Sequence, residues 1–260
     1  MTPTTTIPQE LIGRIIDQLK GDPDSLKICA VVSRSFLFPC RKHLFRAINL
    51  HDSLISLERL YNVLSSQPDI ALLIRECYIF VGDFGGLCEW MAEDIFLPDI
   101  LDMIHHLELI YIYGSLHPLL SVWDTIPIDI RYALLDRFQS PSLTEVVFDD
   151  IGAIPISVIT ALTHVRRLRL IQVALQDDFV VSELEQLAAL DLKTCGRSLP
   201  AQLLIQNLRL LYIRSNDDVN LYSAYNVISS SANSIKTVIW SYSGLESRGK
   251  CPQGLPKWDH

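Results

Sequence analysis

Few residues in this sequence stand at the spacings that catalysis or metal binding requires. Asp83-Phe84-Gly85 spells the triplet that holds magnesium in protein kinases, but the glycine-rich loop, the Val-Ala-x-Lys motif and the His-Arg-Asp motif that act with it are missing. His105 and His106 are adjacent, so on one strand they would point to opposite faces and could not share a metal ion. No cysteine belongs to a C-x-x-C pair. We therefore expect no enzymatic activity, no cofactor and no metal; an enzyme with a cryptic site is the alternative.

The composition predicts a large apolar core and argues against polyanionic partners. Of the 260 residues, 49% are hydrophobic and 20% are charged, and the formal net charge is −8. Binding to phosphates needs clustered Lys and Arg, whereas the densest basic spots here are Arg41-Lys42 and Arg166-Arg167. The N-terminus lacks the features of a signal peptide, and no apolar run approaches the roughly 20 residues of a membrane-spanning helix. We expect no nucleic-acid partner, no membrane association, and a cytoplasmic or nuclear location.

Helical periodicity begins near the N-terminus. Thr6–Gln9 has the form of a capping box, with Pro8 in the first turn of the helix that would follow. Apolar residues then recur at helical spacing from Leu11 to Leu19. This stretch predicts one short amphipathic helix.

Two more short helices are predicted before residue 50. Asp24 or Ser25 can cap the second helix, and Ser33 begins the third. Pro39 must kink the third helix or stand where a helix restarts. Three such helices bury little surface by themselves, so they could form a cap over the end of a larger domain.

Taken in order, these segments resemble an F-box. The family pattern is an apolar-Pro-x-Glu opening, an Ile/Leu helix, an Asp-x-x-Ser-Leu turn and a Val-[Ser/Cys]-[Arg/Lys]-x-[Trp/Phe] ending. The matching segments are Ile7–Ile12, Ile15–Leu19, Asp22–Leu26 and Val32–Phe36. Residues 41–50 resemble the exit segment that is common in fungal F-box proteins. Phe36 stands where many F-boxes have tryptophan, which keeps the hydrophobic anchor and loses the indole donor.

The resemblance implies that residues 1–46 are a helical module that docks a Skp-type adaptor, and through it a cullin–RING ligase. Such docking concentrates its energy in a few apolar anchors. By position in the family pattern, the adaptor-binding residues would be Ile7, Pro8, Leu11, Ile15, Leu26, Cys29, Val32 and Phe36.

The remaining residues, 47–260, repeat a short leucine pattern of the form L-x-x-L-x-L. The clear copies step by about 21–22 residues, within the roughly 20–29 that is typical of leucine-rich repeats, and begin at Leu143, Val165, Leu187 and Leu208. Another copy begins at Ile235, and looser copies begin at Ile74 and Ile104. Irregular spacing around 83–101 and 115–139 predicts insertions or longer helices there.

We therefore expect a mixed α/β fold, in which a three-helix F-box precedes a short leucine-rich-repeat-like solenoid with a parallel strand ladder. Residues 48–50 would form its first strand. No single repeat can bury its apolar side alone, so stacking would create the core. A generic α/β domain with buried parallel strands is the alternative.

The side chains between the core positions would line the concave side of such a solenoid. The copy at Ile104 places His106, Glu108 and Ile110 on that side. A target protein could be held there, through an acidic or phosphorylated segment, by Arg167, Arg169, Tyr212 and Arg214. Alternatively, Glu145 and Asp149 on the neighbouring strand could neutralise the first two arginines as surface ion pairs.

These expectations combine into a function. The chain would be the substrate-recognition subunit of a Skp–cullin–F-box ubiquitin ligase, and its partners would carry out the catalysis. The alternative is a repeat scaffold for protein–protein interaction, without a ligase role, whose N-terminal helices are only a cap. The sequence does not identify the target protein.

Overall fold

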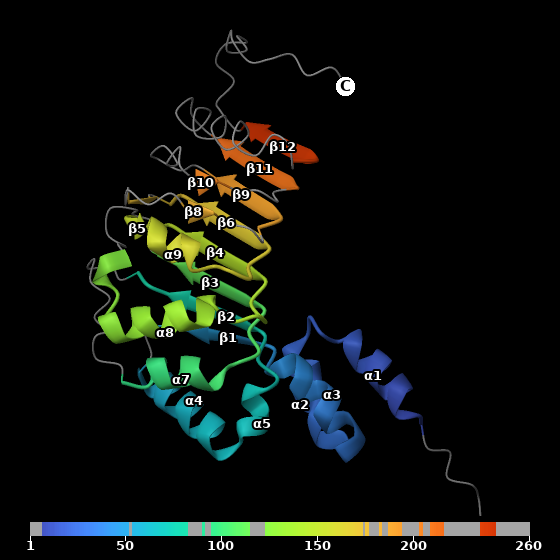
Figure 1. Ribbon diagram of the computed structural model, residues 1–260. Helices are drawn as coiled ribbons and strands as arrows, with labels where there is room; N and C mark the ends of the chain where they lie inside the picture. Colours follow the sequence, from blue (N-terminus) through green and yellow to red (C-terminus); the bar gives the residue numbers. More distant parts are fainter. Residues whose placement is uncertain are drawn as a thin grey trace, which may run out of the picture.

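A computed structural model describes most of the chain. It covers residues 7–51, 54–82, 90–91, 95–114, 123–173, 175–176, 182–183, 187–193, 203–204, 209–215 and 235–242. The protein is mixed α/β, with an N-terminal three-helix unit and an eight-stranded parallel sheet that carries helices along one face (Figure 1).

The three helices of the N-terminal unit are α1 (Gln9–Asp17), α2 (Pro23–Val32) and α3 (Arg34–Leu44). Thr6 lies outside the described residues, and Pro8 is the N-cap of α1. The predicted cap of α2 was wrong, because the Asp22 carboxylate accepts from the backbone N–H of Ser25 at 3.1 Å and from its hydroxyl at 2.6 Å. These hydrogen bonds hold the pKa of Asp22 below its usual value.

Pro39 lies inside α3, which continues through it as one helix, so the restart that the proline could have required does not occur. Proline has no N–H to donate to the carbonyl four residues earlier, which belongs to Ser35. The Gln9 side-chain amide donates to that carbonyl instead, at 2.9 Å. At the other end of the pair, His43 and Asp17 are joined at 2.7 Å. α1 therefore runs parallel to α3 and is held at both ends.

This unit has a small hydrophobic core of its own, formed by Ile12, Ile16, Leu26 and Cys40. Leu44, the last residue of α3, packs against that small core. Phe45, the next residue, packs against the main core of the protein. The boundary between the two cores therefore falls at a single peptide bond.

The main sheet runs parallel in the order β1-β2-β3-β4-β6-β9-β11-β12. Its strands are β1 (Ala47–Leu50), β2 (Glu76–Phe80), β3 (Leu109–Tyr113), β4 (Glu145–Asp149), β6 (Arg167–Ile171), β9 (Ala189–Lys193), β11 (Leu210–Ser215) and β12 (Thr237–Tyr242). The short strands β5 (Ile154–Pro155) and β7 (Leu175–Gln176) pair with each other, as do β8 (Ser182–Glu183) and β10 (Leu203–Leu204).

One backbone hydrogen-bond pattern recurs at every step of the sheet. The carbonyl of Arg46 accepts from two consecutive N–H groups at the start of β2, those of Arg75 and Glu76. The Arg75 carbonyl does the same for Glu108 and Leu109. The series continues through the carbonyls of Glu108, Thr144, Arg166, Ala188 and Arg209. Each later strand of the main sheet thus begins with the same backbone contact to the strand before it.

On one face of the sheet, helices and a 3-10 turn connect the strands from β1 to β6 (Figure 1). They are α4 (Leu54–Ser66), α5 (Pro68–Ala71), α7 (Leu97–Met103), the 3-10 turn η1 (Trp123–Thr125), α8 (Ile128–Phe138) and α9 (Ile156–Thr160). Helices α7 and α8 lie in or overlap the two regions where the leucine spacing is irregular. Alternate strand residues such as Ile110, Phe148 and Leu170 pack with these helices in one continuous core. We call the opposite side of the sheet, away from this core, the open face.

The strand register confirms most of the predicted pattern. Cys77 aligns with Ile110, and Ile110 with Val146, as the copies that begin at Ile74 and Leu143 require. Leu208 lies outside the described residues.

The copy placed at Ile104 was wrong by three residues, because the aligned position is Leu107. Ile104 is the C-cap of α7 and is fully buried. Its buried apolar side chain therefore fits the first position of the leucine pattern, although it does not begin a repeat. His105 and His106 lie in the turn before β3 and not on a strand, and the side chain of Ile110 belongs to the core.

Phe148→Ala is expected to lower the free energy of unfolding by about 3–5 kcal/mol, because Phe148 is fully buried between Trp123 and Phe138. The same replacement at Phe38, which is 66% exposed, should change it by less than about 0.5 kcal/mol. Urea unfolding followed by circular dichroism measures both. Equal losses in the two variants would contradict this account of the core.

Candidate functional site

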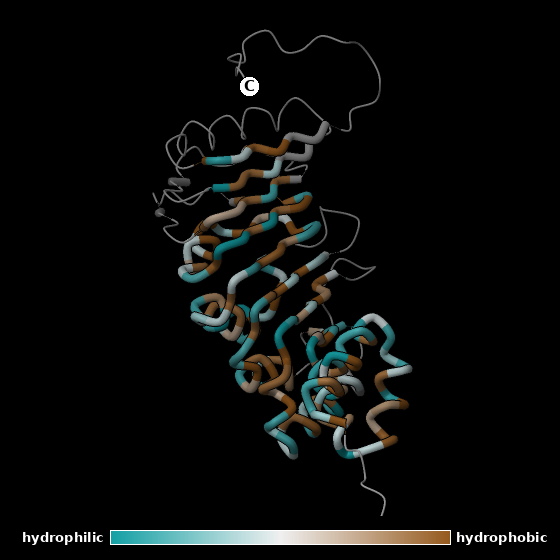
Figure 2. The backbone as a smooth tube through the Cα atoms, turned by 90° about the vertical axis from the view of Figure 1, so that its right-hand side faces the viewer, coloured by the Kyte–Doolittle hydropathy of each residue, from teal (hydrophilic) through white to brown (hydrophobic). Residues whose placement is uncertain are grey.

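The three-helix unit leaves large apolar side chains in contact with water. They are between 48% and 85% exposed, and comprise Ile7, Leu11, Ile15, Ile28, Val31, Val32 and Phe38. Leu11 and Ile15 are one helical turn apart on α1, next to the stripe of Ile12 and Ile16 that faces the small core. Ile28, Val31 and Val32 likewise follow helical spacing on α2. Hydrophobic stretches line these helices, which stand apart from the sheet (Figure 2). We call these seven side chains the apolar face.

The predicted adaptor-binding residues divide into two groups. Ile7, Leu11, Ile15 and Val32 belong to the apolar face, and Pro8 is exposed beside them. Cys29 and Phe36 are partly buried and pack against the small core.

Leu26 was placed wrongly among the exposed anchors. It is only 1% exposed and is part of the small core itself, because it points inward between the helices. Sequence reasoning also missed Ile28, Val31 and Phe38. The spacing of residues 28, 31 and 32 was a usable signal for an outward apolar stripe on α2.

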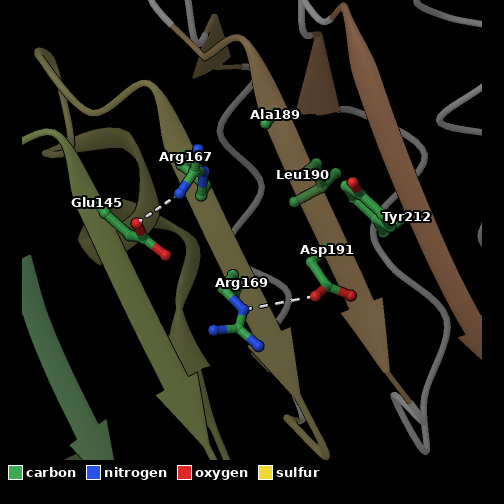
Figure 3. Close-up of a pocket in the computed structure, with 7 residues that line it drawn as sticks. All are labelled: Glu145, Arg167, Arg169, Ala189, Leu190, Asp191 and Tyr212. Carbon is green, nitrogen blue, oxygen red and sulfur yellow. Dashed lines mark hydrogen bonds and ion pairs between the residues drawn. The ribbon is translucent and has the colours of Figure 1, made fainter. Parts of the chain in front are cut away.

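A second candidate site is a hollow of about 360 Å³ on the open face. Strands β4, β6, β9 and β11 contribute its lining, which includes Glu145, Arg167, Arg169, Asp191 and Tyr212 (Figure 3). The hollow brings together three of the four residues predicted to bind a target. The side chain of the fourth, Arg214, lies outside the described residues.

Both arginines of the hollow are paired with carboxylates. Arg167 Nη1 donates to Glu145 Oε2 at 2.9 Å, and Arg169 Nε lies 3.4 Å from Asp191 Oδ2 (Figure 3). The expected neutralisation of Arg167 by Glu145 is therefore present. Arg169 pairs with Asp191 on β9 rather than with Asp149. An anionic ligand would have to compete with these carboxylates for the arginines.

Next to this hollow, β2 and β3 carry four partly exposed aromatic rings on the open face, which we call the aromatic patch: Tyr78, Phe80, Tyr111 and Tyr113. Sequence reasoning missed this patch. The ring centroids of Tyr78 and Tyr111 are 5.6 Å apart, those of Phe80 and Tyr113 are 5.2 Å apart, and those of Tyr111 and Tyr113 are 5.7 Å apart. The signal for the patch was the alternation of aromatic residues in two neighbouring strands.

Two phenols of the patch donate to carboxylates. The Tyr111 hydroxyl donates to Asp149 Oδ2 at 2.5 Å, and the Tyr78 hydroxyl donates to Glu76 Oε2 at 3.2 Å. Burial raises the pKa of Tyr111 well above its usual value, and Asp149 raises it further through the hydrogen bond and its charge. Burial, followed by the charge of Glu76, also raises the pKa of Tyr78. Both phenols therefore stay protonated and remain donors at neutral pH.

The histidine pair lines a shallow hollow beside the C-terminal end of α8, together with Arg137 and Ser142. His105 Nδ1 lies 3.0 Å from Arg137 Nη1, and Arg137 also pairs with Asp136. Within the described residues, no group of three His, Cys, Asp or Glu side chains is placed to hold a metal ion.

Comparisons of the chain with family models, with curated proteins and with solved structures gave no match. In the described parts of the chain, every helix is too short or too polar to cross a bilayer.

Arg169→Ala is expected to lower the free energy of unfolding by about 1–3 kcal/mol, because it deprives the 9% exposed Asp191 carboxylate of this arginine. Arg167→Ala should change it by less than about 1 kcal/mol, because the Arg167 side chain is 61% exposed. Chemical denaturation of the two variants under one set of conditions compares them. A larger loss in Arg167→Ala would refute this ranking of the two ion pairs.

Proposed function

We propose that this chain is the substrate-recognition subunit of a Skp–cullin–F-box ubiquitin ligase. The three-helix unit would act as the F-box, and the sheet region would act as a leucine-rich-repeat-like target-binding solenoid. The observation that carries the proposal is the apolar face, which belongs to a unit with its own core and remains exposed to water.

The apolar face, with its seven large exposed side chains, argues for a protein partner. Isolated surface hydrophobes need no explanation, but seven large exposed ones within one small three-helix unit are more than scattered exposure and favour an interaction site. If the helices were only a cap over the sheet, their apolar side chains would be buried against the main core. Instead, Ile12 and Ile16 face the small core while Leu11 and Ile15 face solvent.

The F-box resemblance specifies the partner. Within the segments that match the family's opening and ending, Pro8, Leu11 and Val32 are exposed. A Skp-type adaptor would supply a helical surface on which these apolar anchors pack. Each fully buried Leu or Ile then contributes roughly 1.5–3 kcal/mol.

The recurrent backbone pattern supports the repeat assignment. Steps of 22 residues separate Leu143 from Val165 and Val165 from Leu187. At each of these steps, one backbone carbonyl accepts hydrogen bonds from two consecutive N–H groups at the start of the next strand. A stack of equivalent units presents one continuous face, which suits a binding surface for another protein.

In this role the chain would bring the target close to the catalytic partners and would not itself catalyse a reaction. Holding a target beside the ubiquitin carrier converts a bimolecular encounter into an effectively intramolecular one. The partner subunits would carry the catalytic groups.

Pro8→Ala combined with Leu11→Asp is expected to lower the affinity for a Skp-type adaptor by more than about tenfold, because it places a charge in an apolar contact. Copurification followed by a quantitative pull-down measures the effect. Leu72→Asp is the matched control, since Leu72 and Leu11 are both 48% exposed and Leu72 lies at the end of α5, outside the three-helix unit. Undiminished adaptor binding by the double variant, or an equal loss in the control, counts against the F-box assignment.

Affinity purification with and without residues 1–44, a deletion that leaves Phe45 and the Arg46 carbonyl in place, separates the two roles of the chain when it is followed by mass spectrometry. The adaptor and cullin should be recovered only with the complete chain. Target proteins should be recovered with both forms. Recovery of neither adaptor nor cullin with the complete chain favours the scaffold alternative.

A further inference from the structure

The aromatic patch lies on the side of the sheet opposite the helices. Its residues alternate along β2 and β3 with Cys77, Ile79, Ile110 and Ile112, which are fully buried in the main core. Each ring packs against a neighbour and is still partly exposed. Among the described residues, no helix covers this side of β2 and β3. The patch therefore offers aromatic surface to a ligand.

Carboxylates stand beside the patch, and arginines accompany some of them. Glu76 and Glu145 are each paired with an arginine, Arg46 and Arg167 respectively. Asp149 instead accepts its hydrogen bond from a neutral phenol, that of Tyr111. Its formal charge is therefore not offset by that contact. A carboxylate next to an aromatic surface is an environment that attracts a cation.

We propose that the aromatic patch and Asp149 bind an extended segment of the target protein that carries arginine or lysine side chains. This inference rests on the proposed role of the open face as the target-binding surface. A guanidinium or ammonium group placed over the ring of Tyr78 or Tyr111 is attracted to the π-face. The same group can then pair with the Asp149 carboxylate, and arginine can do so with two hydrogen bonds.

The neighbouring hollow favours a cationic ligand over an acidic one. Its arginines are already paired with Glu145 and Asp191. A phosphorylated segment would therefore meet carboxylates as well as arginines, and it would lose affinity through the charge of Asp149. A basic segment gains the attraction of Asp149 at the patch, against the repulsion of Arg46 near Tyr78 and of Arg169 near Tyr111. The charge expected of the target is thus the reverse of the acidic segment that Arg167 and Arg169 suggested from sequence.

The geometry suits an extended chain that crosses the strands. Neighbouring strands are spaced by roughly 4.8 Å, and alternate side chains of an extended peptide repeat at roughly 6.8 Å, a difference that the long side chains of arginine and lysine can bridge. The paired rings of β2 and β3 form two short rows across these strands, with centroids 5.6 Å and 5.2 Å apart.

Fluorescence anisotropy with the complete purified chain tests the proposal. The probe is a short fluorescein-labelled peptide of alternating arginine and serine, compared with the same peptide in which citrulline, a neutral isostere, replaces arginine. The arginine peptide should bind at least about tenfold more tightly, because only it offers a charge to the rings and to Asp149. Equal affinity for the two peptides would overturn the proposal.

Matched variants place the binding on the patch. Tyr78→Ala with Tyr111→Ala should weaken binding of the arginine peptide by about tenfold, and Asp149→Asn by about threefold. Tyr132→Ala and Asp102→Asn, at exposed positions on α8 and α7, should leave it unchanged. Tyr78→Phe with Tyr111→Phe keeps both rings and should retain most of the affinity, even if the alanine pair unfolds. Loss of affinity in the phenylalanine pair equal to that in the alanine pair, or equal loss in the controls, contradicts a role for the ring faces.

Adaptor capture by the same variants separates this inference from the proposed function. The aromatic and Asp149 variants should still capture a Skp-type adaptor. Intact adaptor capture without selectivity for the arginine peptide overturns the inference and leaves the ligase role standing. Selective peptide binding by a chain that captures no adaptor refutes the ligase role and assigns the patch to a scaffold.

Discussion

The carbonyl of Arg46 accepts two N–H groups from the start of β2, and each later connection repeats this contact. This bifurcated bond fixes where each strand begins relative to the one before it. Because side chains alternate along a strand, a slip of one residue would exchange the core side and the open side of the slipped strand. The core, the hollow and the aromatic patch all depend on this register.

The register also determines which charges meet. Arg167 lies directly across from Glu145, and Arg169 from Asp191, so the ion pairs of the hollow follow from the alignment of three strands. One row further along the sheet, Asp149 aligns with Tyr113 and accepts from the phenol of Tyr111. The hollow with its ion pairs and the aromatic patch with Asp149 therefore lie side by side on the open face. The basic, extended ligand proposed for this face follows from that arrangement.

Sequence reasoning could place most strands because their core residues recur at nearly equal steps, as at Leu143 and Val165. It failed at β3, where the buried Ile104 at the end of α7 satisfies the same pattern as Leu107. That error of three residues put Ile110 on the open side and hid Tyr111 and Tyr113. Helical spacing puts Leu26 opposite the exposed stripe of Ile28, Val31 and Val32, and the step of 22 residues puts Asp191 level with Arg169, so both signals were present in the sequence. The choice between Asp191 and Asp149 as the partner of Arg169 depends on side-chain packing in three dimensions.

Leu44 and Phe45 are consecutive residues that pack into different cores. Only Phe45 and Arg46 separate the last turn of α3 from the first strand, so the chain contains no tether between its two bodies. In the proposed receptor, the target protein would therefore be held at a fixed distance from the adaptor. That distance could be increased only by adding stacked repeats, each of which would move the binding surface by one strand spacing.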